Sequence, residues 1–209
     1  MEIGILGAGN VGGALGRAWA GNGHQVTFGV ADGSLSRAQE TAARIGEGTK
    51  AALIRDAARA DVVALAVPWD AARGVLESAG DLTGKVLLDC TNPLRGNKFA
   101  TPDAASTSGG EQIAQWAPGA RVVKVFNTLG FEGMQDPDFG GEAATMLYAG
   151  DDAEAKAIAA TLAREMGFDA VDAGPLASAA LLETLASLWG QLAYAQGMGR
   201  GIAFRLLKR

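Results

Sequence analysis

The stretch that decides the fold is Ile3-Gly4-Ile5-Leu6-Gly7-Ala8-Gly9-Asn10-Val11-Gly12, in which an apolar run meets three glycines in a G-x-G-x-x-G pattern. The apolar run predicts a buried strand, and the glycines predict a tight turn into a helix. In such a turn Gly7 permits the sharp bend, Gly9 lets a phosphate approach the backbone, and Gly12 lets the helix pack closely on the sheet. The unpaired N–H groups of a helix that begins near Asn10 would face that phosphate. This stretch therefore predicts a dinucleotide-binding site.

The residues around the glycines matter, because a chain with 30 glycines among 209 residues can contain such a pattern by chance. A helix is expected over residues 11–22, and Gly21-Asn22-Gly23 would end it. Residues 25–28 are rich in β-branched and aromatic side chains and predict a second, parallel strand. The order of strand, turn, helix and strand favours a phosphate-binding turn over an ordinary glycine-rich turn.

Strands and helices alternate through the rest of the chain. Residues 61–67 are almost wholly apolar, as in a strand that is buried on both faces of a parallel sheet. Further strands are expected over residues 50–53, 86–89, 121–126, 145–149 and 170–172, and helices over residues 34–45, 55–59, 70–78, 111–116, 153–166 and 178–198. This alternation predicts an α/β fold with a Rossmann-type, doubly wound, mostly parallel sheet and a C-terminal helical extension.

Two regions are expected from this pattern. An NAD(P)-binding Rossmann domain would span residues 1–175, and a helical segment over residues 176–209 would pack on that domain or at a dimer interface. The terminal helix is apolar around much of its circumference, which favours a homodimer over packing on its own domain alone. Residues 95–111 are expected to form a loop beside the site.

The composition narrows the classes of partner. The chain has 48% hydrophobic and 20% charged residues, as expected of a globular domain, and no apolar run reaches the roughly 18 to 20 residues that cross a bilayer. We therefore expect no membrane partner and a cytoplasmic location. A net charge of −5 argues against a nucleic-acid partner, which would need clustered lysine and arginine. A small molecule or a second subunit is the expected partner.

The single cysteine and the single histidine leave little support for thiol or metal chemistry. Cys90 follows a predicted strand and is expected to be a buried packing residue, with redox use as the alternative. His24 lies at the entry to the second strand, where a structural role is expected. The residues predict no metal site and no catalytic side chain.

Polar and proline residues follow three predicted strands, at the sheet edge where open α/β folds bind ligands. These residues are Val67-Pro68, Asn92-Pro93 and Asn127-Thr128-Leu129. The prolines fix the direction of the backbone, and the two asparagines offer donors and acceptors to a nicotinamide carboxamide or to a bound substrate. The alternative for each asparagine is a side chain that stabilises a turn.

Taken together, these motifs resemble those of the coenzyme F420-dependent NADP oxidoreductase family. This family is in turn similar to the cytosolic reductase domain of the STEAP metalloreductases. The motifs span nearly the whole chain: residues 7–12, Val67-Pro68-Trp69, Thr91-Asn92-Pro93, residues 123–128, Gly150-Asp151-Asp152 and residues 172–176. The resemblance implies hydride transfer between a nicotinamide and a deazaflavin or flavin ring such as coenzyme F420. Such a reaction depends on the orientation of two rings more than on an acid or a base.

The resemblance also implies positions for the bound groups. Ala8-Gly9-Asn10-Val11 would hold the pyrophosphate, Val67-Pro68 would line the nicotinamide side, and Asn127-Thr128-Leu129 would border the second ring. The motifs are specific for the family and not for one acceptor.

The end of the second strand selects neither NADP nor NAD. Relatives that prefer NADP carry a small polar residue and then an arginine there, whereas this chain has Val30 and Ala31. An NAD-binding chain would carry an acidic residue, and Asp32 lies two positions beyond the usual place. Ser34 and Arg37, at the start of the next helix, offer an alternative phosphate site. The resemblance implies NADP, and NAD stays open.

Two functions remain in competition. The first is an NAD(P)H-dependent oxidoreductase whose acceptor is coenzyme F420, a flavin or another small molecule. The alternative is a non-catalytic NADP(H)-binding redox sensor that responds through the loop at residues 95–111 and a dimer surface. Turnover in the first case and its absence in the second distinguish them.

Overall fold

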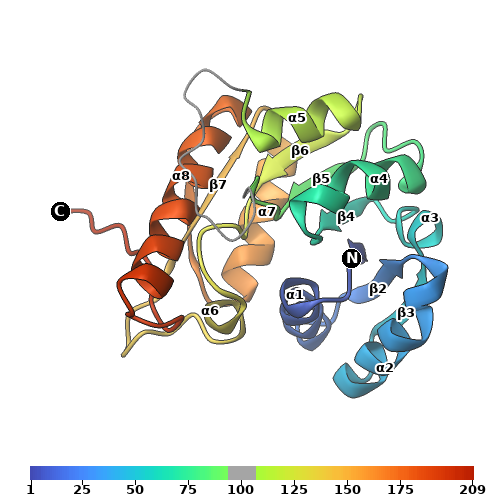
Figure 1. Cartoon of the computed structure of the whole chain (residues 1–209), viewed down its shortest axis with the longest axis horizontal. Helices are drawn as coiled ribbons and strands as arrows, with labels where there is room; N and C mark the ends of the chain where they lie inside the picture. Colours follow the sequence, from blue (N-terminus) through green and yellow to red (C-terminus); the bar gives the residue numbers. More distant parts are fainter. Residues whose placement is uncertain (94–106) are drawn as a thin grey trace.

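The computed structural model describes residues 1–93 and 107–209, and these form one eight-stranded sheet in the order β3-β2-β1-β4-β5-β6-β7-β8. The strands are β1 (Glu2–Leu6), β2 (Gln25–Val30), β3 (Thr49–Leu53), β4 (Val62–Leu65), β5 (Val86–Asp89), β6 (Arg121–Lys124), β7 (Thr145–Gly150) and β8 (Asp169–Asp172). Neighbouring strands are parallel except for β6 and β7, which run antiparallel. The predicted Rossmann-type, mostly parallel fold is therefore confirmed (Figure 1).

Helices cover both faces of this sheet (Figure 1). They are α1 (Asn10–Gly21), α2 (Leu35–Ile45), α3 (Ile54–Ala57), α4 (Trp69–Ala79), α5 (Gly109–Trp116), α6 (Phe131–Gln135), α7 (Ala153–Glu165) and α8 (Ala179–Gly190), with short 3-10 turns at Asp32–Ser34 and Leu176–Ser178. The side chains of β4 show why two layers form. Val62 and Ala64 belong to one buried apolar cluster, and Val63 and Leu65 belong to the other, on the opposite face.

Several predicted boundaries differ from the structure for local reasons. The strand expected to reach residue 126 ends at Lys124, because the backbone of Phe126 has a positive φ of 58°. The helix expected over residues 178–198 ends at Gly190 and continues only as a π-helical turn to Ala195. Beyond it Gly197 and Gly199 have positive φ values of 69° and 76°, which a right-handed helix does not contain. The short helix α6 was not predicted.

The loop expected over residues 95–111 is only partly covered by the described chain. Residues 94–106 lie outside the described residues, and Gly109 and Gly110 are helical. Helix α5 starts earlier than predicted because Ser108 caps it: the Ser108 hydroxyl accepts a bond from the Glu111 amide, and the Glu111 carboxylate accepts one from the Ser108 amide.

The C-terminal segment is attached along the start of β7. The amide of Thr145 donates to the carbonyl of Phe204 (2.9 Å), and its hydroxyl accepts from the amide of Leu206 (2.9 Å). The indole of Trp189 in α8 donates to the carbonyl of Ile202 (2.7 Å). Within the described ranges, no helix is both long enough and apolar enough to cross a membrane.

Candidate functional site

The glycine-rich turn between β1 and α1 has the geometry that its sequence predicts. Gly7 has a φ of 113°, and a Cβ there would lie 2.4 Å from the carbonyl oxygen of Ala66. A Cβ on Gly12 would lie 2.2 Å from the carbonyl oxygen of Gly7, so the helix packs against the turn itself. A Cβ on Gly9 would meet no atom within 4 Å. The space beside Gly9 is therefore open to a ligand, and the N-terminus of α1, at Asn10, directly follows it.

A first cavity, of about 330 Å³, opens on one side of this turn. It brings together predicted site residues from three separate stretches of the chain: Gly7, Ala8, Gly9, Val30, Ala31, Ser34, Arg37, Val67 and Pro68. Ile54 and Val75 also line it and were not predicted. The cavity thus joins the glycine turn, the end of β2 and the end of β4, as a dinucleotide-binding crevice does.

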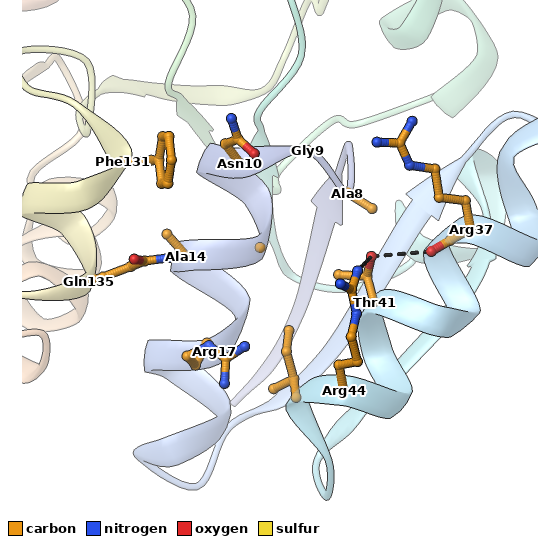
Figure 2. Close-up of a pocket in the computed structure, with 12 residues that line it drawn as sticks. Ala8, Gly9, Asn10, Ala14, Arg17, Arg37, Thr41, Arg44, Phe131 and Gln135 are labelled. Carbon is orange, nitrogen blue, oxygen red and sulfur yellow. Dashed lines mark hydrogen bonds between the residues drawn. The ribbon is translucent and has the colours of Figure 1, made fainter. Parts of the chain in front are cut away.

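A second cavity, of about 340 Å³, lies on the other side of the turn, between α1, α2 and α6 (Figure 2). Its cationic lining residues are Arg17, Arg37 and Arg44, and no acidic side chain of the described residues lines it. None of these three arginines forms an ion pair within the described part of the chain. Arg37 lines both cavities, so the positive charge continues from one to the other.

Most of the second cavity was missed by sequence reasoning. Asn10 was a predicted residue, whereas Arg17, Arg44 and Phe131 were not. The spacing of Arg37, Thr41 and Arg44 by four and three residues, which places them on one face of α2, is the signal that would have found part of it. Phe131 lies on the unpredicted α6.

Most of the remaining predicted residues gather at the ends of β5 and β6, apart from the linings of these two cavities. Asn92 donates from Nδ2 to the carbonyl oxygen of Asn127 (2.9 Å), and Asn127 donates from Nδ2 to Oδ1 of Asn92 (3.0 Å). Thr128 and Leu129 are buried, and Pro93 is half-buried. Val11 and Gly12 lie on α1 but do not line either cavity.

Strained backbone precedes Asn127. Phe126 is the only non-glycine residue of the described chain with a positive φ, a conformation that costs roughly 1 to 2 kcal/mol for a side chain with a Cβ. Its ring is buried edge-on to Trp19, with centroids 5.7 Å apart, and its amide donates to the sulfur of Met146 (3.3 Å). Packing thus holds the chain in the bend that directs Asn127 toward Asn92.

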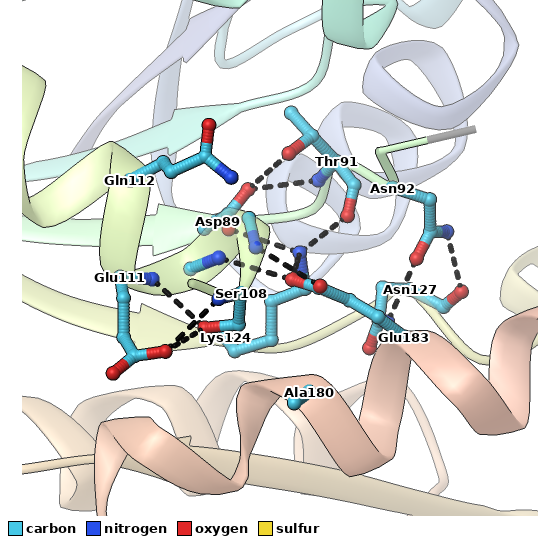
Figure 3. A network of polar contacts seen from close by, with 12 residues as sticks. Asp89, Thr91, Asn92, Ser108, Glu111, Gln112, Lys124, Asn127, Ala180 and Glu183 are labelled. Carbon is cyan, nitrogen blue, oxygen red and sulfur yellow. Dashed lines mark hydrogen bonds and ion pairs between the residues drawn. The ribbon is translucent and has the colours of Figure 1, made fainter. Parts of the chain in front are cut away.

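A fully buried ion cluster lies beside the two asparagines (Figure 3). Nζ of Lys124, in β6, lies 3.0 Å from Oδ2 of Asp89, in β5, and 3.0 Å from Oε1 of Glu183, in α8. It also donates to the carbonyl of Thr91, the residue before Asn92. Burial by itself lowers the pKa of Lys124, but attraction to the two carboxylates and hydrogen bonds to them outweigh burial and raise it. The lysine is therefore charged at neutral pH.

The cluster connects three elements. Both oxygens of Glu183 accept bonds from the first amides of α5, Gly109 and Gly110, each at 3.0 Å. A carboxylate at a helix N-terminus is favoured by unpaired N–H groups and by the helix dipole. This cluster was not predicted, although a lysine inside the apolar run Val122-Val123-Lys124-Val125 was a signal for a buried ion pair.

The surroundings of Cys90 and His24 fit a structural role for both residues. Cys90 is buried, and burial raises the pKa of its thiol well above the usual range, so it is not a thiolate at neutral pH. Nε2 of His24 lies 2.7 Å from Oε2 of Glu165, and its Nδ1 contacts the N-terminal amine. Among residues 1–93 and 107–209, no group of three or more potential ligands could hold a metal ion.

Comparison with protein families finds a match over the N-terminal part of the chain. The profile of a family described as coenzyme F420-dependent NADP oxidoreductase matches residues 2–93, which include the glycine turn and the ends of β2, β4 and β5. The chain is also 29% identical over 186 residues to metalloreductase STEAP3 of Rattus norvegicus. That match covers 88% of this chain and 36% of the length of the metalloreductase.

Solved structures extend the similarity to the whole chain. A candidate F420-dependent NADP reductase from Arthrobacter sp. FB24 is 33% identical, with a TM-score of 0.87 and full coverage of both chains. A hypothetical protein from Sinorhizobium meliloti is 30% identical, with a TM-score of 0.77, over 86% of this chain and 87% of that one. The C-terminal segment that contains Glu183 is thus part of the shared structure with the Arthrobacter protein.

Proposed function

The chain belongs to the coenzyme F420-dependent NADP oxidoreductase family, and on that premise we propose that it transfers hydride between NADP(H) and a planar acceptor of the deazaflavin or flavin type. The observation that carries this proposal is the first cavity, which joins the glycine turn with the ends of β2 and β4. Nicotinamide cofactors bind across such a crevice in doubly wound sheets.

The residues present fit a dinucleotide. Open space beside Gly9 admits a pyrophosphate, and the first amides of α1 are available to it. Apolar walls from Val30, Val67 and Pro68 suit the faces of a base and a ribose. When bound, NADP(H) would supply the hydride, and the work of the protein is to hold two rings in register and exclude water.

The charge around Arg37 favours NADP over NAD. In folds of this type the 2′-phosphate of NADP lies beyond the end of β2, and there Ser34 and Arg37 line the first cavity, whereas Asp32 is not among its lining residues. The second cavity continues this positive region with Arg17 and Arg44. Cationic side chains without acidic partners are a ready site for a phosphate dianion.

Two arguments favour a deazaflavin or flavin as the hydride acceptor: the family to which the chain belongs, and the lack of an evident proton donor in the first cavity. Among the described residues that line the first cavity, only Arg37 is titratable, and a guanidinium is a poor proton donor, whereas reduction of a carbonyl would need a proton donor. Purified protein supplied with NADPH should reduce oxidised coenzyme F420, FMN or FAD, as followed by nicotinamide absorbance. Binding of NADPH without turnover on all three would refute the proposal and favour the non-catalytic sensor. We also propose that the protein works in the cytoplasm, which cell fractionation would test.

We further propose a homodimer through the outer face of α8, which lies at the edge of the molecule (Figure 1). Leu181 is 70% exposed and Leu188 is 47% exposed on this face, and large apolar side chains clustered on a surface favour a partner. Light scattering should give the dimer mass for the wild type and the monomer mass for Leu181→Glu. Leu53→Glu, on β3 and also exposed, is the control that should leave the mass unchanged. A monomeric wild type would contradict this part.

A further inference from the structure

An unpaired acceptor lies at the ends of β5 and β6. Oδ1 of Asn127 is buried and has no hydrogen-bond partner in the described chain, and the residue as a whole is only 4% exposed. Most buried polar atoms of native proteins are hydrogen-bonded, so each exception asks for an explanation. Strain in the neighbouring Phe126 is a second observation at the same place, because strained backbone often accompanies ligand sites.

The hydrogen bonds around it fix which atom is unpaired. Nδ2 of Asn92 faces the carbonyl oxygen of Asn127, which can only accept, so the amide of Asn92 has one orientation. Oδ1 of Asn92 must then accept from Nδ2 of Asn127. The remaining branch of the Asn127 amide is therefore an oxygen, and it needs an N–H or O–H donor.

The surrounding cluster keeps this oxygen in place. Lys124 binds the carbonyl of Thr91, and Asp89 accepts from both the amide and the hydroxyl of Thr91, at 2.9 Å and 2.7 Å. The turn that carries Asn92 is thus anchored to a buried ion cluster (Figure 3). Asn92 in turn holds Asn127, so the unpaired oxygen is preorganised instead of free to turn toward another donor.

We propose that Oδ1 of Asn127 accepts a hydrogen bond from the carboxamide N–H of the nicotinamide and so selects the orientation of that ring. This inference rests on the proposed function. A dinucleotide whose adenosine end lies at Val30 and Arg37 runs across β1 and β4 toward β5 and β6, which brings its amide end to Asn127. Because this oxygen is buried in the structure, the inference requires the atoms that cover it to move aside as the ring enters.

The test compares NADPH with its reduced 3-acetylpyridine analogue, in which a methyl group replaces the amide NH2. Dissociation constants for both are measured by fluorescence with the wild type and with Asn127→Leu. The wild type should bind the analogue about tenfold more weakly, and the variant should bind both equally, because only the wild type offers the acceptor. An equal affinity in the wild type, or the same penalty in the variant, would overturn the inference.

Two further measurements keep the result clear. The first is the affinity of the wild type for 2′-phospho-ADP-ribose, which has no nicotinamide. If the wild type binds neither this compound nor NADPH, the proposed function fails. If it binds both, and binds the acetylpyridine analogue as tightly as NADPH, only this inference is refuted. If Asn127→Leu does not fold, NMR of wild-type protein with NADPH labelled at the carboxamide nitrogen replaces it. The carboxamide protons should move downfield and exchange slowly in the complex, and unchanged protons would overturn the inference.

Discussion

Substitution of Lys124 by methionine should strongly destabilise the protein. The side chain is fully buried, and so are the two carboxylates that it pairs with, Asp89 and Glu183. Removal of one partner from a buried pair costs about 3 to 5 kcal/mol, and the lost bond to the Thr91 carbonyl adds about 1 kcal/mol. We therefore expect the free energy of unfolding to fall by about 4 to 6 kcal/mol, a large share of the roughly 5 to 15 kcal/mol typical of a domain.

Urea unfolding followed by circular dichroism measures this loss, and a compensating variant separates charge from packing. In the double variant Lys124→Met with Glu183→Gln, one unpaired carboxylate is removed while an oxygen still accepts from an amide of α5. We expect it to recover roughly 1 to 3 kcal/mol of the loss. A loss below about 1.5 kcal/mol in the single variant, or a further loss in the double variant, would refute this account of the cluster.

The stability difference between the wild type and Lys124→Met should also depend on pH. The native pKa of Lys124 is raised, so its stabilising contribution is complete below the unfolded-lysine pKa of about 10.4 and is lost as the pH rises through the native value. The stability difference between wild type and Lys124→Met should therefore stay constant from about pH 7 to 10 and shrink above that range. A difference that grows at alkaline pH would have the wrong sign.

Three other predictions concern the cofactor site and the cysteine. The variant Gly9→Val should melt at nearly the wild-type temperature but bind NADPH about 100-fold more weakly, because the valine side chain would occupy the open space where the ligand binds. The control for a glycine substitution outside the site is Gly74→Val, since a Cβ on Gly74 would also meet no atom within 4 Å. Arg37→Ala should lower the affinity for NADPH by about tenfold and leave that for NADH nearly unchanged, and an equal loss for both would contradict a 2′-phosphate role. Cys90 should react with a thiol reagent only in denaturant, and rapid labelling of the native protein would show that its burial is wrong.

The sequence was most informative where local rules determine the structure. The glycine turn follows from steric limits at Gly7 and Gly12, and the buried strands follow from continuous apolar runs such as Val62–Leu65. The gathering of Val30, Arg37 and Val67 around one cavity was predictable, because parallel strands end at the same edge of the sheet.

Features that depend on distant contacts were not predictable in the same way. Glu183 is buried because it meets Lys124 and the N-terminus of α5, and neither partner is near it in the sequence. The early end of β6 depends on the packing of Phe126 against Trp19, which overrides the β propensity of an apolar run. The second cavity depends on α6, a five-residue helix too short for a periodic signal.

Direct transfer of hydride from NADPH to the acceptor can be tested by following the transferred hydrogen. NADPH that carries deuterium at the transferable ring position is incubated with the protein and oxidised coenzyme F420, and the reduced coenzyme is analysed by mass spectrometry. Direct hydride transfer predicts one deuterium in the reduced deazaflavin ring, and far less of this product at the same subsaturating NADPH concentration when Gly9→Val replaces the wild type. Bound NADPH with no reduction of the coenzyme, or reduced coenzyme without deuterium, would contradict the account.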